Sequence, residues 1–422
     1  MFSRTLLILL CSFALAVVAA PAGSNSASPA SSALPEFQTT APASDAPNDQ
    51  TFPQDETSGT PEPIEGALGA PLLGGQNIEL DRQNPDFLAP PTTDNGVVGS
   101  AKWSFSLSHN RMGTGGWSRQ QNVALMPIAT AMASVNQRLE VGAVRELHWH
   151  TTAEWGFVLA GGISVTAINS DGQNFEDTIN AGDIWYFPAG IPHSIQATDA
   201  SPDGAELLLV FDNGNFAADS TFSLTDWMAH VPKEVLAKNF QINVTAFDHI
   251  PAKELFIFPT APPPTDEKAV SNPQGTVPNP YTFKLSQVPA TKVAGGTVKV
   301  VDSRTFKVAT TIVGAIVTVE PGAMSYFLEG TGRATIFASS ATAETFDYQA
   351  GDIGYVPPSF GHYVENTGNT TLSFMEIFNA DIFEDISLNQ WLALTPPELV
   401  KANLGFDDAT IAKLSKVKQL VI

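Results

Sequence analysis

The sequence predicts an all-β protein made of two tandem β-barrel or β-sandwich domains with a few short helices. Short apolar runs alternate with turn signals along most of the chain. Gly (32 residues) and Pro (31 residues) are frequent, as in turn-rich β folds. The second half of the chain also repeats motifs of the first half. With 422 residues, the chain exceeds the length that one hydrophobic core usually supports, about 250–300 residues.

The first 20 residues have the pattern of a secretory signal peptide. Arg4 supplies a positive charge, Leu6 to Val18 form an apolar run, and Ala19-Ala20 are small residues near a cleavage site. The run is short for a membrane span, which needs about 20 apolar residues. We therefore expect a secreted, extracellular protein. The only cysteine, Cys11, lies in this segment, so the mature chain would have no disulfide.

The rest of the chain divides into a polar segment and two folded blocks. Residues 21–74 are rich in Ser, Ala, Pro and Thr and lack a hydrophobic period, which predicts disorder. The two blocks are residues 75–258 and 281–422, and a Pro-rich linker at 259–280 separates them.

Predicted strands and helices can be placed within these blocks. Strands are predicted at 163–168, which alternates, and at 183–187, with the turn signal Asp171-Gly172 between them. Helical patterns are few, with the clearest at 224–230 and 232–238 and another at 397–402, and residues 388–393 echo 224–229.

The charge balance limits the classes of partner. The chain has 43 acidic and 21 basic residues, a net charge of −22. This excess argues against nucleic acid and against anionic membrane surfaces. It also repels an anionic substrate, so a site for an anion would need a metal ion and an arginine.

Sequons at Asn243 and Asn369 fit a secreted glycoprotein.

A candidate metal site lies in the run from Gly142 to Trp155. His148 and His150 occupy positions i and i+2, which point to one face of a strand, and Glu154 has the same parity. A second run, Gly182 to His193, supplies a third imidazole. Three imidazoles and one carboxylate suit manganese, iron, nickel or zinc.

The two halves repeat at two different offsets. Gly182-Asp183-Ile184 matches Gly351-Asp352-Ile353, and His193 matches His362, both at an offset of 351 − 182 = 169. Gly142-Ala143 matches Gly322-Ala323, at an offset of 322 − 142 = 180. The difference, 180 − 169 = 11, is a gap between Met324 and Ser325 in the second half. The counterpart of residues 145–155 is therefore absent there.

The second domain is accordingly predicted to lack the metal motif. We interpret His362 as a remnant, and Glu365 has no evident role without a metal. Two explanations of the gap stay open. One is a degenerate second domain kept for structure and assembly, and the other is a sequence error, such as an exon boundary assigned wrongly in the gene model.

These motifs resemble those of the cupin superfamily. The first cupin motif, G-x5-H-x-H-x3-E-x6-G, is matched by Gly142, His148, His150, Glu154 and Gly161. The second is matched by Gly182, Pro188, Gly190 and His193, with Ala197 where the motif has Asn. The duplication, the phrase Arg-Glu-Leu-His-Trp-His and the Thr-Asp-Trp helix resemble the bicupin oxalate decarboxylases of the fungal secreted type. The resemblance extends from about residue 75 to the end.

The resemblance implies two jelly-roll barrels and a manganese enzyme. It implies that His148, His150, Glu154 and His193 bind Mn(II), that dioxygen is a catalytic cofactor, and that Arg145 holds a carboxylate of oxalate. The reaction implied is cleavage of oxalate to formate and CO2. It requires a proton donor in a lid, where Ala218 stands at the position of the bacterial glutamate. Asp219 is the only acid in that lid, so Asp219 is the candidate donor.

Two alternative functions stay open. If no lid acid donates a proton, the same site would favour oxidation of oxalate to CO2 and H2O2, as in an oxalate oxidase. The second alternative is a non-enzymatic metal-binding or storage bicupin, although such proteins typically lack the complete His/Glu set. Because related bicupins are often oligomeric, a homo-oligomer is also expected.

Overall fold

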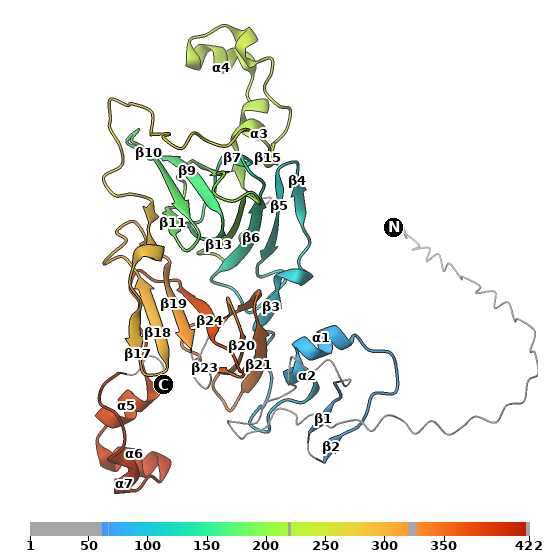
Figure 1. Cartoon of the computed structure of the whole chain (residues 1–422), viewed down its shortest axis with the longest axis vertical. Coiled ribbons are helices and arrows are strands. Elements are labelled where there is room, and N and C mark those ends of the chain that lie inside the picture. The colour runs from blue at the N-terminus through green and yellow to red at the C-terminus, as the bar shows by residue number, and fades with distance from the viewer. Residues whose placement is uncertain (1–60, 66, 218–220, 320–326, 419–422) are drawn as a thin grey trace, which may run out of the picture. The chain divides into compact units, whose positions relative to one another are not determined.

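Antiparallel β-sheet makes up most of the regular structure, and the helices are short (Figure 1). The computed structural model describes residues 61–65, 67–217, 221–319 and 327–418. The predicted class, mostly β with two domains and a few short helices, is confirmed. Within the described part of the chain, no helix is both long and apolar enough to cross a membrane.

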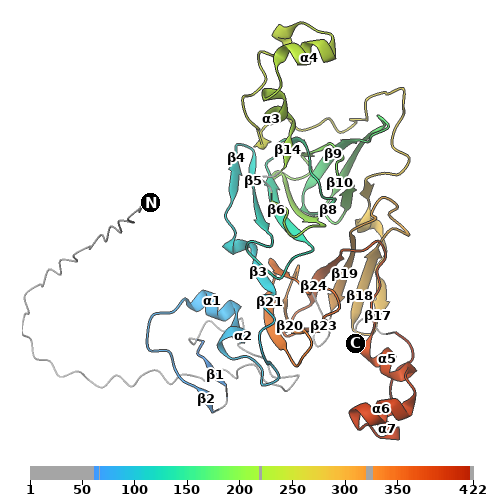
Figure 2. The same cartoon turned by 180° about the vertical axis from the view of Figure 1, so that it is seen from behind.

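The first domain consists of two antiparallel sheets (Figure 2). The six-stranded sheet has the order β10 (Asn174–Asn180), β9 (Gly162–Ile168), β12 (His193–Ala197), β7 (Val144–Trp149) and β14 (Phe222–Ser223), and β15 (Ile257–Phe258) also pairs with β7. The seven-stranded sheet has the order β16 (Thr282–Phe283), β11 (Ile184–Phe187), β8 (Glu154–Ala160), β13 (Ala205–Phe211), β6 (Ala133–Leu139), β5 (Gly116–Gln121) and β4 (Arg111–Gly113).

Alternating apolar side chains from the two sheets form the core of this domain. Ile163 and Val165 of β9 are fully buried and share one core with Val158 of β8 and Leu207 of β13. Burying each such aliphatic side chain contributes about 1.5–3 kcal/mol. The predicted turn between β9 and β10 is present, and Gly172 takes the left-handed conformation with φ of +75°. The sequence-based strands at 163–168 and 183–187 are therefore confirmed.

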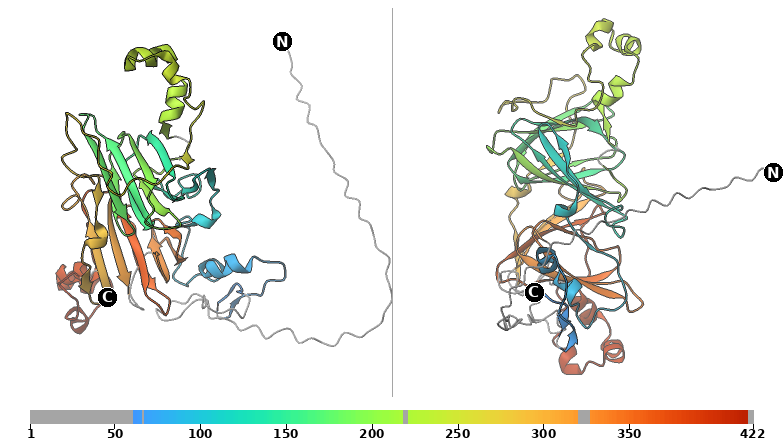
Figure 3. Two further views of the ribbon diagram at one scale, coloured as in Figure 1. Left: turned by 45° about the horizontal axis from the view of Figure 1, so that its top comes forward. Right: turned by 90° about the vertical axis from the view of Figure 1, so that its right-hand side faces the viewer.

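The second domain has fewer strands. A four-stranded sheet has the order β17 (Thr291–Val293), β18 (Gly296–Val301), β19 (Val313–Val319) and β24 (Leu372–Phe378). A three-stranded sheet has the order β21 (Ala343–Gln349), β20 (Thr331–Phe337) and β23 (Gly361–Asn366). Phe346, Tyr348 and Phe374 are among the buried aromatic side chains that fill the core of this domain. Figure 3 shows the strands of both sheets from two further directions.

The strands of the two domains correspond at the two offsets found in the sequence. The first residues of β5 and β18 are related by the offset 296 − 116 = 180, and those of β9 and β20 by the offset 331 − 162 = 169. The first domain has β7 and β8 between β6 and β9. Between β19 and β20, the described residues 327–330 form only an isolated bridge, Glu329 with Ser373. Met324 and Ser325, where the gap falls, lie outside the described residues.

The two domains exchange short strands. β3 (Lys102–Ser104) lies in the first block of the sequence but pairs with β22 (Asp352–Gly354) of the second domain. β16 lies at the start of the second block but pairs with β11 of the first domain. Trp155, Ile312 and Met375 belong to a buried cluster that both domains share. Each domain therefore depends on a segment that lies next to the other in the sequence.

The helices lie outside the sheets. Seven are described: α1 (Ile78–Gln83), α2 (Pro85–Leu88), α3 (Leu224–Ala229), α4 (Lys233–Phe240), α5 (Leu388–Leu394), α6 (Pro397–Leu404) and α7 (Asp408–Ile411). The helical predictions at 224–230, 232–238 and 397–402 are confirmed by α3, α4 and α6. α6 ends at Gly405, which has the left-handed φ of +67° that commonly terminates a helix. A small hairpin of β1 (Ile64–Glu65) and β2 (Leu68–Gly69) lies within the segment predicted to be disordered.

A buried acid lies in α2, one of the two N-terminal helices that contact the second domain. α1 and α2 contact β21, and Asp86 of α2 is 2% exposed, with neither carboxylate oxygen in a hydrogen bond. Burial raises the pKa of Asp86 well above its usual value, the charge of Asp347 raises it further, and Lys102 opposes both. Lys102 itself forms a buried ion pair with Asp352 at 3.4 Å. The protonated form of Asp86 is therefore favoured in the folded protein.

We expect Asp86→Asn to change how stability depends on pH. A raised pKa in the folded state contributes stability that is present below the unfolded pKa, about 3.9, and is lost as pH rises through the folded pKa. The amide side chain of the variant cannot ionise, so the variant should be more stable than the wild type at pH 7. The difference should shrink towards pH 4 by up to about 1.4 kcal/mol per pH unit. Urea unfolding at several pH values measures it.

Asp203→Asn, in an exposed turn, is the matched control and should leave the pH profile of the wild type unchanged. If the free energy of unfolding differs between Asp86→Asn and the wild type by the same amount at pH 4 and pH 7, the assignment of a protonated Asp86 is contradicted.

Candidate metal centre

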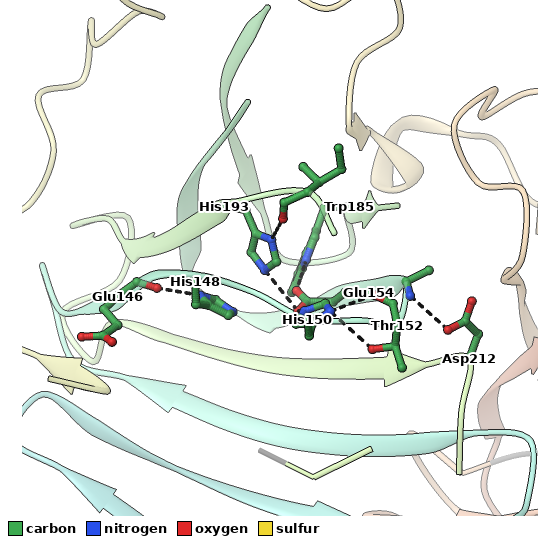
Figure 4. Close-up of polar contacts among 10 residues, drawn as sticks. Glu146, His148, His150, Thr152, Glu154, Trp185, His193 and Asp212 are labelled. Atoms are coloured by element: carbon green, nitrogen blue, oxygen red, sulfur yellow. Dashed lines mark hydrogen bonds and ion pairs between the residues drawn. The ribbon is translucent and has the colours of Figure 1, made fainter. Parts of the chain in front are cut away.

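Four side chains of the first domain converge on one point (Figure 4). His148, His150, Glu154 and His193 are all buried, and one potential ligand atom from each lies within 4.8 Å of the others. The structure thus brings together all four residues that the sequence analysis selected as metal ligands. His148 lies in β7, Glu154 begins β8, and His193 begins β12.

Glu154 reaches this point from the opposite sheet. β7 ends at Trp149, residues 150–153 form a turn, and β8 then pairs with β11 and β13 in the seven-stranded sheet. The argument that Glu154 shares the strand parity of the histidines was therefore wrong. Its carboxylate instead faces the histidines across the interior of the domain. Asp212 holds the turn, because its Oδ1 accepts a hydrogen bond from the backbone N of Ala153 at 3.0 Å.

A β-bulge places Arg145 beside the histidines. His148 pairs with His193 and Arg145 pairs with Ile195, so a spacing of three residues on β7 opposes a spacing of two on β12. In a regular strand, residues three apart point to opposite faces, but one extra residue reverses that relation. As a result, Arg145 and His148 line the same cavity.

Backbone carbonyl groups orient the three imidazoles. Nδ1 of His148 contacts the carbonyl O of Glu146 at 2.6 Å, Nδ1 of His150 that of Thr152 at 2.8 Å, and Nδ1 of His193 that of Ile191 at 2.7 Å. A carbonyl oxygen can only accept, so each Nδ1 carries the proton and each Nε2 presents a lone pair. Metal-binding histidines are commonly oriented in this way.

A tryptophan side chain holds one oxygen of the Glu154 carboxylate. Nε1 of Trp185 donates to Oε1 at 2.7 Å, and Nε2 of His150 lies 3.0 Å from Oε2. Trp185 reaches this position only because residue 156 is glycine. A Cβ atom there would lie 2.0 Å from Cζ2 of Trp185, closer than any real contact.

Burial and neighbouring charges set the protonation states. Burial, assisted by the charge of Arg145, holds the pKa of His148 well below its usual value. Burial also lowers the pKa of His193, against the opposing effect of Glu154. For Glu154, burial alone would raise the pKa, but polar contacts with His150 and His193 outweigh it and hold the pKa well below its usual value. Neutral imidazoles and an ionised carboxylate are the forms that bind metal ions.

Arg145 is a buried cation that has no ion-pair partner among the described residues. Its Nη1 donates to the carbonyl O of Phe256 at 3.3 Å, and its guanidinium lies 4.9 Å from the centre of the Phe256 ring. Burial lowers the pKa of Arg145 to about 10, so the side chain stays charged at neutral pH. A buried charge without a partner is costly, and an anion in the cavity would offset that cost.

The cavity joins the metal ligands to Arg145. Apolar side chains form much of its wall, and the lining includes Val135, Ile195, Leu209, Phe211, Phe216, Thr221 and Phe256. Phe216 and Thr221 flank the segment 218–220. Asp219, the predicted proton donor, lies outside the described residues, so its position is not given by the structure. Trp185 and Phe256 act on the site through contacts that no local sequence pattern signals.

The second domain keeps one trace of such a site. Nδ1 of His362 contacts the carbonyl O of Phe360 at 3.2 Å, which parallels the contact of His193 with Ile191. His362 is exposed, however, whereas His193 is 3% exposed. Across the described residues, the first-domain cluster is the only group of three or more His, Cys, Asp or Glu side chains suited to a metal ion.

The donor set fits a transition metal ion. Nε2 of His193 is buried and makes no hydrogen bond, and its contact with Oε2 of Glu154 is 3.5 Å. A metal ion would satisfy this nitrogen together with the other imidazoles. Imidazole and carboxylate donors accept manganese, iron, nickel or zinc, so the geometry leaves the choice among these metals open.

Comparisons with known proteins identify close relatives. A family model described as Cupin matches residues 108–246 and 284–412. The chain is 48% identical over 375 residues to the oxalate decarboxylase OxdC of Bacillus subtilis, covering 86% of this chain and 97% of that protein. It is 38% identical over 403 residues to an oxalate decarboxylase of Arthroderma benhamiae, covering 86% of this chain and 93% of that protein.

A solved structure of the Bacillus subtilis oxalate decarboxylase, from work on its Mn(II) centres, aligns with a TM-score of 0.82 at 47% identity. The alignment covers 86% of this chain and 99% of that one.

We expect the purified protein to bind about one divalent transition metal ion per chain, since one complete donor set is described. His193→Ala removes a donor and should reduce the metal content to well below half of that value. His362→Ala changes the corresponding histidine of the second domain and should leave the metal content unchanged. Inductively coupled plasma mass spectrometry of the three proteins measures this. About two ions per chain, or a loss in His362→Ala, would contradict a single centre in the first domain.

Proposed function

Because the chain belongs to the bicupin oxalate decarboxylases of the cupin superfamily, we propose that it cleaves oxalate to formate and CO2 at the first-domain centre. The observation that carries this proposal is the buried Arg145, which has no ion-pair partner among the described residues and lies beside the cluster of three histidines and Glu154. A small dicarboxylate can meet both a metal ion and a guanidinium in one cavity. An excess of negative charge elsewhere in the chain makes this local positive charge necessary.

Mn(II) is the proposed metal, with dioxygen as a catalytic cofactor. Support for manganese comes from the Mn(II) centres of the Bacillus subtilis relative and from a donor set that accepts this ion. When bound, the metal would polarise one carboxylate of oxalate and accept electron density from it. His148, His150, Glu154 and His193 would hold it, with their orientation set by the backbone carbonyl groups and by Trp185.

Arg145 would bind the second carboxylate of oxalate. A guanidinium offers a rigid fork of N–H donors that matches a carboxylate, and it stays charged throughout the reaction. The apolar wall of the cavity excludes water from the carbon that loses CO2. The carbon–carbon bond breaks, one carboxyl group leaves as CO2, and the remaining carbon gains a proton to become formate. No net oxidation occurs.

We propose Asp219 as the donor of that proton. It is the only acid in the segment between Phe216 and Thr221, and both of these residues line the cavity. If the proton is not delivered, the remaining fragment can lose two electrons to dioxygen, so that oxalate yields CO2 and H2O2. This is the oxalate oxidase alternative. A storage function fits less well, because it would not require the complete donor set beside an unpaired arginine.

Secretion and self-association are also proposed. The signal-like residues 1–20 and the exposed sequon residues Asn243 and Asn369 support secretion of a glycoprotein. Trp227 of α3 and Trp391 of α5 are 59% and 62% exposed, which is unusual for a large aromatic side chain and supports a homo-oligomer. Intact and native mass spectrometry of protein from the culture medium tests both proposals.

We expect product analysis to show mainly formate from wild-type protein and less formate from Asp219→Asn. The amide keeps the size of the side chain but cannot supply the proton, so the formate yield should fall by about 10- to 100-fold while the share of H2O2 rises. Formate and peroxide are quantified on samples of known metal content with excess oxalate and dioxygen.

Asp226→Asn, at an exposed acid in α3 outside the cavity, is the matched control and should keep the wild-type product ratio. Peroxide as the main product of the wild type would favour the oxidase. A wild-type ratio in Asp219→Asn would exclude this aspartate as the donor.

A further inference from the structure

Besides Glu154 of the metal cluster, two carboxylates act on Arg145 without forming an ion pair with it. The charges of Glu146 and Glu254 both favour the protonated guanidinium, yet neither side chain forms an ion pair with it. An ion pair with either residue would occupy the N–H donors that a substrate carboxylate needs. The structure therefore has to keep both of them away from Arg145.

Glu146 is held by hydrogen bonds of its own. Its carboxylate is 2% exposed and accepts from Oγ1 of Thr225, at 3.0 and 3.2 Å, and from the backbone N of Leu255 at 2.7 Å. These contacts attach the start of α3 to β7. Glu146 is not among the residues that line the cavity.

Glu254 is held by Arg111 of β4. The two side chains form an ion pair, and Oε2 of Glu254 also accepts from Oγ of Ser223 at 3.2 Å. Both members of the ion pair are partly exposed, with about 30% of each side chain accessible. Neither Arg111 nor Glu254 lines the cavity.

The ring of Phe256 lies close to both arginines. The guanidinium of Arg111 lies 4.0 Å from the centre of the Phe256 ring, and that of Arg145 lies 4.9 Å from the same centre. The backbone of Phe256 has φ of +61°, a left-handed value that is uncommon for a bulky residue. In this conformation its carbonyl O accepts from the backbone N of Glu146 at 3.1 Å and from Nη1 of Arg145.

We propose that Arg111 is a positioning residue that holds Glu254 away from Arg145 and so keeps the buried guanidinium free for a carboxylate of oxalate. This role rests on the proposed function of the site. Arg111 itself is neither one of the metal-binding residues nor part of the cavity lining. Its effect on substrate binding passes through Glu254 and through the ring of Phe256.

The physical consequence concerns competition for one cation. Without Arg111, Glu254 loses its ion-pair partner. The negative charge of Glu254 already acts on the guanidinium of Arg145. Attraction between these groups is stronger in a buried site than in water. Glu254 would then compete with oxalate for the N–H groups of Arg145, and its charge would also repel the dianion.

A double-mutant cycle tests this role. Calorimetry on metal-loaded protein gives the dissociation constant of oxalate for the wild type, Arg111→Gln, Glu254→Gln and the double variant, with metal content measured for each. We expect Arg111→Gln to bind oxalate about tenfold more weakly. Glu254→Gln should bind at least as tightly as the wild type, and the double variant should return to within about threefold of it. Arg111→Lys keeps the ion pair and should bind as the wild type does.

The remaining outcomes decide on the positioning role of Arg111 or on the proposed function. If Arg111→Gln binds oxalate as tightly as the wild type, the positioning role is overturned. It is also overturned if the double variant binds oxalate as weakly as Arg111→Gln, because Glu254→Gln does not rescue a loss that is merely structural. If Arg111→Gln holds less metal than the wild type, a double variant that regains both metal and oxalate supports the role, and one that regains neither overturns it. Wild-type protein with bound metal but no affinity for oxalate would instead overturn the proposed function.

Discussion

The buried carboxylate of Glu154 is the group on which the arrangement of the first domain depends. It is 0% exposed, and an ionised carboxylate in such a place is tolerated only when donors or cations surround it. Trp185 and His150 contact one oxygen each, and a metal ion would supply the rest of the compensation. Because Glu154 belongs to one sheet and His148 and His193 to the other, the metal centre also ties the two layers of the domain together.

The electrostatics of the cavity follow from the same constraint. Burial and the charge of Arg145 lower the pKa of His148, burial lowers the pKa of His193, and Glu154 remains ionised, so a bound divalent ion and Arg145 would make the interior of the cavity positive. This charge is local, since the chain as a whole carries −22. Neighbouring carboxylates would cancel it if they were free to turn inwards. The hydrogen bonds of Glu146 and the ion pair of Glu254 therefore belong to the design of the site.

The second domain shows what is lost when the segment corresponding to β7 and the start of β8 is absent. Its described residues include β23 and β24, which correspond to the strands β12 and β13 that pair with β7 and β8 in the first domain, but no three residues that could bind a metal. Pairing between the domains compensates in part, because β3 and the helices α1 and α2 pack on the second domain and provide buried ion pairs such as Lys102 with Asp352. A domain with this support can keep a core of Phe346, Tyr348 and Phe374 without a metal centre.

Local pattern in the sequence was sufficient for the fold class, the repeat, the predicted strands and helices, and the four metal ligands. The reason is that side-chain periodicity and motif spacing are properties of neighbouring residues. Three features depended on the tertiary structure: Glu154 comes from the opposite sheet, a bulge in β7 turns Arg145 into the cavity, and the ring of Phe256 lies close to both Arg111 and Arg145. Each of them results from pairing between segments far apart in the chain. Strand register and long-range contacts set such features, and no local spacing encodes them.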